Sequence, residues 1–325
     1  MPLSPIATAN EWAHRAAALV LMALLVTSSP GANATSPPKP DNRVIVHSQG
    51  ETRVSGTPKR VVTLFQGAND TAVALGVTPV GVVDAWAQGT HYDYLDKALD
   101  GISSVGLETQ PSLEAIALLE PDLIIASRRR HEAIYPQLSQ IAPTVSLATV
   151  FDVPRTLEIM GQALNREDKA NALWVDWQAR LKDFRQQAER TLGNRWPLSA
   201  TVLNFRADHT RLYLGGSYAG SVLKDLGFTQ PPAHPKNLWM MKLTTKESIP
   251  IIDADVVFYF MEDDPSVRDS FDAWTRHPLW QNLDAARNQQ VYPVDRVAWN
   301  LAGGILGANR MLDQLFEHFE LEDGS

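Results

Sequence analysis

Apolar residues occur along the first half of the chain in two kinds of segment, short clusters and longer stretches with helical spacing. The unbroken run at residues 123–126 is typical of a strand covered on both faces of a parallel sheet. Parallel strands are predicted at residues 60–65, 79–84, 123–127 and 144–149. Helical patterns lie at residues 69–75, 92–99, 113–119 and 132–141. Before the first strand, residues around Gln49-Gly50 predict a hairpin. The alternation predicts a doubly wound N-terminal α/β lobe over residues 43–152.

The third of these units carries clear local signals. Ser112 is a good helix N-cap, and Glu114 falls in the first turn, where a carboxylate suits the positive end of the helix dipole. Pro121-Asp122 ends the helix, so the buried strand 123–127 runs directly into Arg128 and its basic neighbours. In open α/β sheets, ligands bind at the carboxyl ends of the strands. This edge is therefore a candidate binding site.

The pattern changes after residue 152. Residues 167–192 contain neither Gly nor Pro, and Trp177, Leu181 and Phe184 recur there at helical spacing. A helix of that length would span roughly 40 Å at 1.5 Å per residue, which is enough to join two lobes. An ordinary packing helix would give the same pattern. We expect a connecting helical segment at residues 153–196.

The strand and helix alternation resumes after this segment. Strands are predicted at residues 200–205, 211–214, 256–260 and 290–293. Helices are predicted at residues 217–226, 246–252 and 302–319. The sequence thus predicts a second, C-terminal α/β lobe over residues 197–325.

The two halves contain a matching segment. SLEAIALLEPDLIIA, from residue 112, aligns with TKESIPIIDADVVFY, from residue 245, at a constant offset of 133 residues. Chance could supply the apolar matches, but Glu114 and Glu247 occupy the same helix position. We therefore predict a duplicated architecture of two α/β lobes joined by a long helix, with a ligand cleft between them. The two glutamates could present carboxylates to arginines of a two-fold symmetric partner.

The N-terminal residues predict export. An apolar stretch at residues 16–26 follows Arg15, and small residues at 32–34 offer a cleavage site, so residues 1–34 are interpreted as a signal peptide and 35–42 as a linker. A buried N-terminal helix is the alternative. The chain has no cysteine, which excludes disulfides and a lipid-anchoring cysteine after the signal. We expect a soluble, monomeric periplasmic protein.

The net charge of −8 makes nucleic acid an improbable partner. Gly215-Gly216-Ser217-Tyr218-Ala219 comes near a serine-hydrolase elbow but lacks its last glycine, and Ser217 also suits a helix N-cap. A serine hydrolase is the alternative from another class. The sequence has no phosphate-binding loop, dinucleotide fingerprint or H-E-x-x-H motif, and its eight histidines are scattered. We predict neither catalysis, nor a cofactor, nor a direct protein–metal site.

Cationic and aromatic residues follow several predicted strands. Arginine presents a planar fork that binds carboxylates bidentately, and the arginines expected to contact a ligand are Arg128, Arg130, Arg206 and Arg296. We interpret Arg129 as a solvated charge, because adjacent side chains at a turn point apart. Four aromatic residues could line the cleft or belong to the core: Trp86, Tyr213, Trp239 and Trp299.

Six segments together carry a resemblance to a known family. They are TPKRVVTLF from Thr57, ALGVTPVGVVD from Ala74, VGLETQPSLEAIALLEPDLIIAS from Val105, RHEAIYPQLSQIAPTV from Arg130, GSVLKDLGF from Gly220 and HPLWQNLDAARNQQVYPVD from His277. From about residue 43 to residue 320, the chain resembles the periplasmic binding proteins of iron-siderophore and cobalamin ABC importers. Within that family it is most similar to the ferric dicitrate and related carboxylate or hydroxamate siderophore branch.

The resemblance implies a rigid connecting helix and a shallow cleft with little closure. It also implies that Glu114 and Glu247 dock on an inner-membrane ABC permease, and that Arg130 is the family's arginine of the R-H-x-x-x-Y segment. The expected ligand is ferric citrate or a citrate-type or hydroxamate siderophore, with Fe(III) held by the chelator. A cobalamin or haem binder of the same architecture is the runner-up.

One position departs from the family pattern. The residue after Val105-Gly106-Leu107 is often arginine in siderophore binders and is Glu108 here. A carboxylate at the cleft would repel an anionic complex. The sequence leaves three explanations: Glu108 turns away, Arg128 and Arg129 compensate for it, or the ligand is less anionic.

Overall fold

The structure is a computed structural model that describes residues 42–87 and 91–323, which belong to one compact unit. The predicted signal peptide, and the predicted linker up to residue 41, lie outside the described residues. Within residues 42–87 and 91–323, no helix is long and apolar enough to cross a membrane. A small hairpin of β1 (Asn42–His47) and β2 (Gly50–Ser55) begins the fold, as the sequence predicts.

The first lobe is built on a six-stranded sheet with the order β6-β5-β4-β3-β7-β8. Its strands are β3 (Val61–Thr63), β4 (Gly81–Asp84), β5 (Ser103–Leu107), β6 (Gln110–Pro111), β7 (Leu123–Ser127) and β8 (Thr144–Leu147). Only the short β6 at the edge is antiparallel to its neighbour. The helical segments of this lobe are α1 (Gln66–Ala74), η1 (Asp93–Leu95), α2 (Asp96–Leu99), α3 (Leu113–Leu118), α4 (Arg128–His131), η2 (Glu132–Ile134) and α5 (Tyr135–Ile141).

Strand β7 shows why this sheet has helices on both faces. Every residue of β7 is buried, as expected for an unbroken apolar run. Ile124 belongs to one core cluster with Ile116 of α3, whereas Ile125 belongs to another with Ala68 of α1. The doubly wound arrangement is therefore confirmed for this lobe.

The second lobe is built on a five-stranded sheet with the order β11-β10-β9-β12-β13. Its strands are β9 (Ala200–Phe205), β10 (Thr210–Tyr213), β11 (Met240–Leu243), β12 (Val256–Met261) and β13 (Val291–Pro293). Strands β9, β12 and β13 are parallel, and β10 and β11 add an antiparallel half. The helical segments are α8 (Tyr218–Leu226), η4 (Lys246–Ile252), α9 (Pro265–Thr275), α10 (Pro278–Gln281), α11 (Asp284–Arg287), η5 (Val297–Leu301) and α12 (Ile305–His318).

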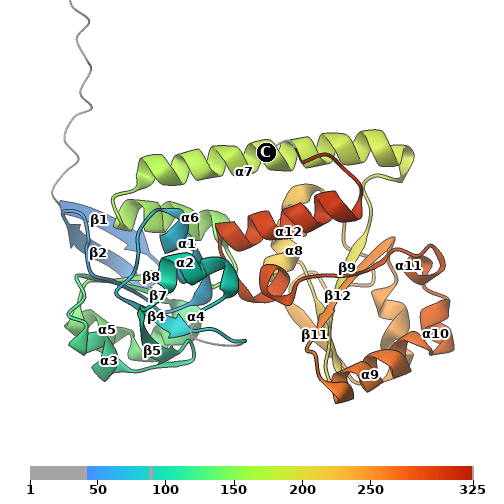
Figure 1. The fold of residues 1–325 in the computed structure, drawn as a ribbon, viewed down its shortest axis with the longest axis horizontal. Coiled ribbons are helices and arrows are strands. Elements are labelled where there is room, and N and C mark those ends of the chain that lie inside the picture. Colours follow the sequence, from blue (N-terminus) through green and yellow to red (C-terminus); the bar gives the residue numbers. More distant parts are fainter. Residues whose placement is uncertain (1–41, 88–90, 324–325) are drawn as a thin grey trace, which may run out of the picture. The chain divides into compact units, whose positions relative to one another are not determined.

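Two helices join the sheets, α6 (Val153–Ala163) and α7 (Glu167–Leu192), followed by the short η3 (Gly193–Arg195). Helix α7 packs on α6 and on α8, and Figure 1 shows it running beside both. Its inward stripe includes Trp177, Leu181 and Phe184, and the ring of Phe184 meets that of Phe316 edge to face at 5.4 Å. These residues belong to one core cluster that contains side chains from both sheets. The long helix predicted from the sequence is therefore an integral part of the core.

The 133-residue repeat is also present in the structure. Strands β7 and β12 begin at Leu123 and Val256, which are 133 residues apart. The preceding aspartates play the same part: Asp122 accepts hydrogen bonds from the backbone before β3, and Asp255 accepts one from the backbone before β9. The helices differ, because Pro250 lies inside η4 and η4 is a 3₁₀ helix.

A buried carboxylate links α1 to α12. Asp70 accepts hydrogen bonds from the Tyr94 hydroxyl at 2.7 Å and from the backbone N–H groups of Leu306 and Gly307 at 2.9 and 2.8 Å. The backbone of Gly304 approaches so closely that a Cβ there would lie 2.1 Å from Asp70 Oδ1. Burial raises the pKa of Asp70 to about 6, although all three donors oppose the shift.

Replacing Asp70 with Ala is expected to lower the free energy of unfolding by roughly 2 to 4 kcal/mol, because three buried or partly buried donors lose their acceptor. Urea denaturation measures the loss, and Asp100→Ala, at an exposed position, is the control.

The loss is also expected to depend on pH. Between the ordinary carboxyl value of 3.8 and the raised pKa, the folded protein holds a proton that the unfolded chain has released. The contribution of Asp70 to stability is thus largest below pH 4 and declines as the pH rises through about 6. The difference between wild type and the Asp70→Ala variant should therefore be larger at pH 4 than at pH 7. A larger difference at pH 7 would contradict the raised pKa.

Candidate functional site

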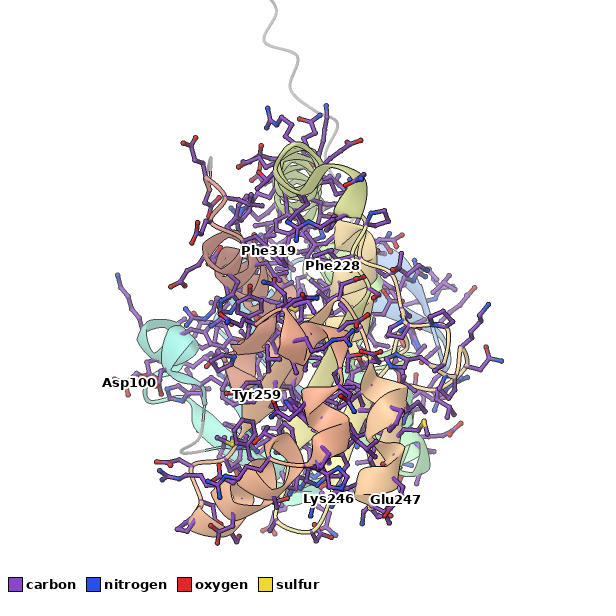
Figure 2. The ribbon with its side chains drawn as sticks, turned by 90° about the vertical axis from the view of Figure 1, so that its right-hand side faces the viewer. Asp100, Phe228, Lys246, Glu247, Tyr259 and Phe319 are labelled. Carbon is purple, nitrogen blue, oxygen red and sulfur yellow. The ribbon has the colours of Figure 1, made fainter. Side chains whose placement is uncertain are left out.

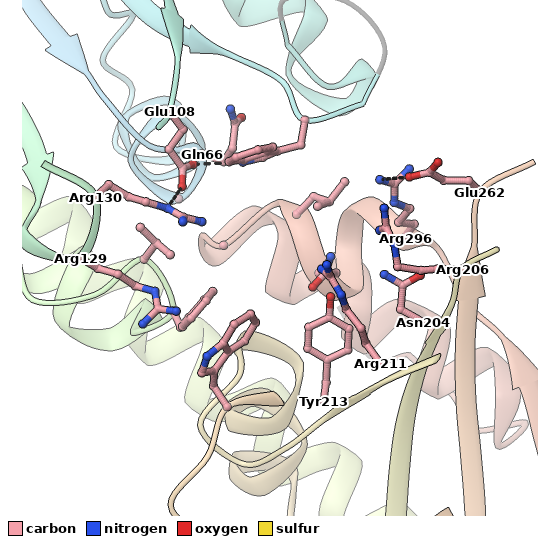
Figure 3. A pocket seen from close by; sticks show the side chains of 18 residues that line it. Gln66, Glu108, Arg129, Arg130, Asn204, Arg206, Arg211, Tyr213, Glu262 and Arg296 are labelled. Carbon is pink, nitrogen blue, oxygen red and sulfur yellow. Dashed lines mark hydrogen bonds and ion pairs between the residues drawn. The ribbon is translucent and has the colours of Figure 1, made fainter. Parts of the chain in front are cut away.

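A cleft with a volume of about 490 Å³ lies between the carboxyl ends of the two sheets. Figure 3 shows its lining side chains. The first lobe contributes Gln66, Gly67, Trp86, Glu108, Arg129, Arg130, Val150 and Phe151. The second contributes Asn204, Arg206, Arg211, Tyr213, Trp239, Glu262, Arg296, Asn300, Leu301 and Gly303. The cleft therefore forms where the carboxyl-end rule for α/β sheets places it.

Positive charge is concentrated in this cleft. Five arginines and two glutamates line it, a formal excess of three positive charges in a chain whose net charge is −8. A recess lined by one sign of charge attracts ligands of the opposite sign. Because guanidinium groups are donors only, the cleft is suited to an anion rich in oxygen acceptors.

Glu108 is the partner of Arg130. Arg130 Nε donates to Glu108 Oε1 at 2.7 Å, and Glu108 Oε2 accepts from the backbone N–H of Gln66 at 3.1 Å and from Trp86 Nε1 at 3.4 Å. Only 3% of Glu108 is exposed. The pair joins a buried carboxylate to the cationic wall and leaves the two terminal nitrogens of Arg130 without a bond to Glu108. Arg130 itself thus balances the charge of Glu108.

Arg129 lines the cleft and Arg128 does not, which is the reverse of the expectation from the sequence. The guanidinium of Arg129 lies 5.2 Å from the ring centres of both Phe151 and Trp239, inside the cleft. Arg128 is exposed and is not among the lining residues. The physical reason is that helical backbone begins at Arg128, so successive side chains turn by about 100° and the first of them points away.

The second lobe contributes three arginines. Arg296 Nη2 contacts Glu262 Oε1 at 2.7 Å, and Arg211 Nε donates to His209 Nε2 at 3.2 Å. Among the residues described, Arg129, Arg206 and Arg211 form no ion pair with a carboxylate. Three guanidinium groups of the cleft are thus available to the carboxylates of a ligand.

Arg211 was not predicted as a cleft residue, because it lies within a strand and not at its end. Side chains alternate between the two faces of a strand, so Arg211 and Tyr213 of β10 share a face, and both line the cleft. Counting back two residues from the expected cleft residue Tyr213 would have indicated Arg211.

The predicted aromatic residues divide between the cleft and the core. Trp86, Tyr213 and Trp239 line the cleft. Trp299 does not: it is 1% exposed, its ring lies 4.6 Å from that of Phe258, and its Nε1 donates to Gln314 at 2.8 Å. Trp299, a candidate cleft residue from the sequence, is therefore a core residue instead, because the η5 turn directs it inward.

Ser217 has a structural role. Its Oγ donates to the carbonyl of Leu214 at 2.7 Å and accepts from the backbone N–H of Gly220 at 3.0 Å, which makes it the N-cap of α8. It is buried and absent from the cleft lining. Within the described ranges, no group of three or more His, Cys, Asp or Glu side chains is arranged to hold a metal ion.

The two glutamates of the repeat are exposed. Glu114 lies in the first turn of α3 and Glu247 in the first turn of η4, and Figure 2 shows Glu247 beside Lys246 at the surface. Hydrogen bonds from its own backbone N–H and from Thr245 hold the pKa of Glu247 below its usual range. Neither residue lines the cleft, so they belong to a separate surface.

Two α/β lobes, a helix packed against both and a cationic cleft between their strand ends define a solute-binding protein. The family model described as periplasmic binding protein matches residues 61–298, and the chain belongs to this family.

Named relatives agree with this assignment. The achromobactin-binding periplasmic protein of Dickeya dadantii is 52% identical over 260 residues, covering 79% of this chain and 85% of the relative. The Fe(3+) dicitrate-binding periplasmic protein FecB of Escherichia coli is 30% identical over 259 residues, covering 78% and 83%. The crystal structure of Staphylococcus aureus SirA complexed with staphyloferrin B matches with a TM-score of 0.83 and 43% identity, covering 86% of this chain and 99% of SirA.

Proposed function

We propose that this protein captures a ferric chelate of the carboxylate-rich siderophore type and delivers it to an inner-membrane ABC permease. The observation that carries the proposal is the set of arginines contributed to one cleft by both lobes, with an excess of three positive charges. The names of the relatives support the ligand class, because they bind achromobactin, ferric dicitrate and staphyloferrin B.

In this proposal the iron is held by its chelator. Guanidinium groups have no lone pair to offer a metal ion, so the arginines recognise oxygen atoms of the chelate instead. The aromatic rings of Trp86, Tyr213 and Trp239 supply apolar surface for its organic part. Binding requires no catalytic group.

The proposal includes the location and boundaries inferred from the sequence. Residues 1–34 act as the export signal and 35–42 as a linker, and the mature protein works in the periplasm as a monomer without a lipid-anchoring cysteine. Residues 43–152 and 197–325 are the two lobes, and 153–196 connect them. Membership of a periplasmic binding family supports the compartment.

Titration with ferric staphyloferrin B or ferric citrate is expected to change the intrinsic tryptophan fluorescence in a saturable way, because Trp86 and Trp239 line the cleft. Haem, cobalamin and a ferric hydroxamate serve as competing ligands. Trp86→Phe and Trp239→Phe variants, which should lose part of the signal, separate it from absorption by the chelate. If neither carboxylate chelate gives a saturable change, the proposed function is wrong.

A further inference from the structure

Arg211 is held in the cleft by a series of linked side-chain contacts at the hairpin between β9 and β10. Its Nε lies 3.2 Å from His209 Nε2, and His209 Nδ1 lies 2.6 Å from Asp208 Oδ1. Lys242 of the neighbouring β11 lies 3.6 Å from the other carboxylate oxygen of Asp208. His209 is 7% exposed and Asp208 is 72% exposed, so these side-chain contacts extend from the surface to the cleft.

The contacts determine where the histidine proton lies. Arginine only donates hydrogen bonds, so His209 Nε2 must carry the lone pair that accepts from Arg211. Nδ1 of a neutral ring then carries the proton, which it donates to Asp208. This bond lowers the pKa of Asp208.

We propose that His209 is a positioning residue for ligand binding: as the neutral Nδ1–H tautomer, it holds Arg211 by Nε and leaves both terminal nitrogens for a carboxylate of the ligand. The statement about the ligand rests on the proposed function. Arg130 of the opposite lobe is held through the same atom, but by the carboxylate of Glu108. One cleft arginine is therefore positioned by a charged group, and the other by a neutral group.

The first test needs no ligand. Nitrogen-15 NMR of the histidine side chains in the full chain, with His209→Gln used to assign the signal, distinguishes the two tautomers. A neutral Nδ1–H ring at pH 7.5 is expected. An Nε2–H tautomer, or an imidazolium at that pH, would overturn the proposal, whatever the protein binds.

The second test compares two variants with ferric staphyloferrin B and with ferric citrate. His209→Leu removes the acceptor and should weaken binding about tenfold at pH 7.5. His209→Gln places an amide oxygen near the position of Nε2 and should remain within about twofold of wild type. In an Arg211→Ala background, His209→Leu should have no further effect, because its role is exerted through Arg211.

The two comparisons separate positioning from packing. An undiminished His209→Leu effect in the Arg211→Ala background, or equal losses of affinity in His209→Gln and His209→Leu, would overturn the proposal. Failure of wild type to bind either chelate would instead remove the proposed function, and the NMR result would still decide the position of the histidine proton.

Discussion

Replacing Arg206 and Arg211 together with Ala is expected to weaken the binding of ferric staphyloferrin B by roughly a hundredfold or more. Both side chains line the cleft, and neither forms an ion pair with a carboxylate among the residues described. A hydrogen bond to a charged group contributes about 1.5 to 3 kcal/mol, or roughly ten- to a hundredfold in affinity, and two such bonds are removed. Partial exposure of both side chains favours the lower end of this range.

The matched control is Arg128→Ala. It removes one arginine charge from an exposed site outside the cleft, half of what the double variant removes, so affinity should change by less than about twofold. Calorimetry at two salt concentrations separates direct contact from long-range attraction, because salt screens exposed charges beyond roughly 10 Å. Equal losses in Arg128→Ala and in the double variant would show that only the general field matters, and would remove Arg206 and Arg211 from the site.

Sequence patterns predicted the buried parts of the fold best. The bounds of β7, β9 and α7 agree with the prediction, because a largely apolar run or a long helical stripe has few alternative structures. Strands β5 and β11 were not predicted, since each is largely exposed or half-buried and has no unbroken apolar run. The α/β pattern was therefore visible where both faces of an element are covered, and hidden in strands that are largely exposed or half-buried.

Only those residues of the candidate site that follow the ends of strands could be predicted from the sequence. Arg130, Arg206 and Arg296 line the cleft as expected, because the carboxyl-end rule uses local sequence alone. Partners distant in sequence were not visible: the bond between Arg130 and Glu108 joins residues 22 positions apart. Asp70 bonds to a backbone group 236 residues away. Tertiary packing creates these pairs, and no local pattern indicates them.

Replacing Glu114 and Glu247 together with Ala is expected to abolish uptake of a ferric carboxylate chelate through the cognate permease, while binding of the chelate stays unchanged. Both carboxylates are exposed, lie outside the cleft and occupy equivalent first turns 133 residues apart. Such a pair suits a partner that presents two arginine clusters related by two-fold symmetry, since each carboxylate accepts a bidentate fork. Loss of one carboxylate should leave partial uptake, because the other lobe still docks.

Radioactive iron uptake measures this outcome in cells that carry the permease but lack their own binding protein. A charge-matched control, Glu132→Ala with Asp269→Ala, removes one exposed acid from each lobe at positions outside the repeat. This control should transport normally, whereas the Glu114 and Glu247 variant should not, although both bind the chelate as wild type does. Equal uptake by the two double variants would refute docking through the repeat. Because the arginine variants fail at binding and the glutamate variants fail after it, the two sets separate the cleft from the docking surface.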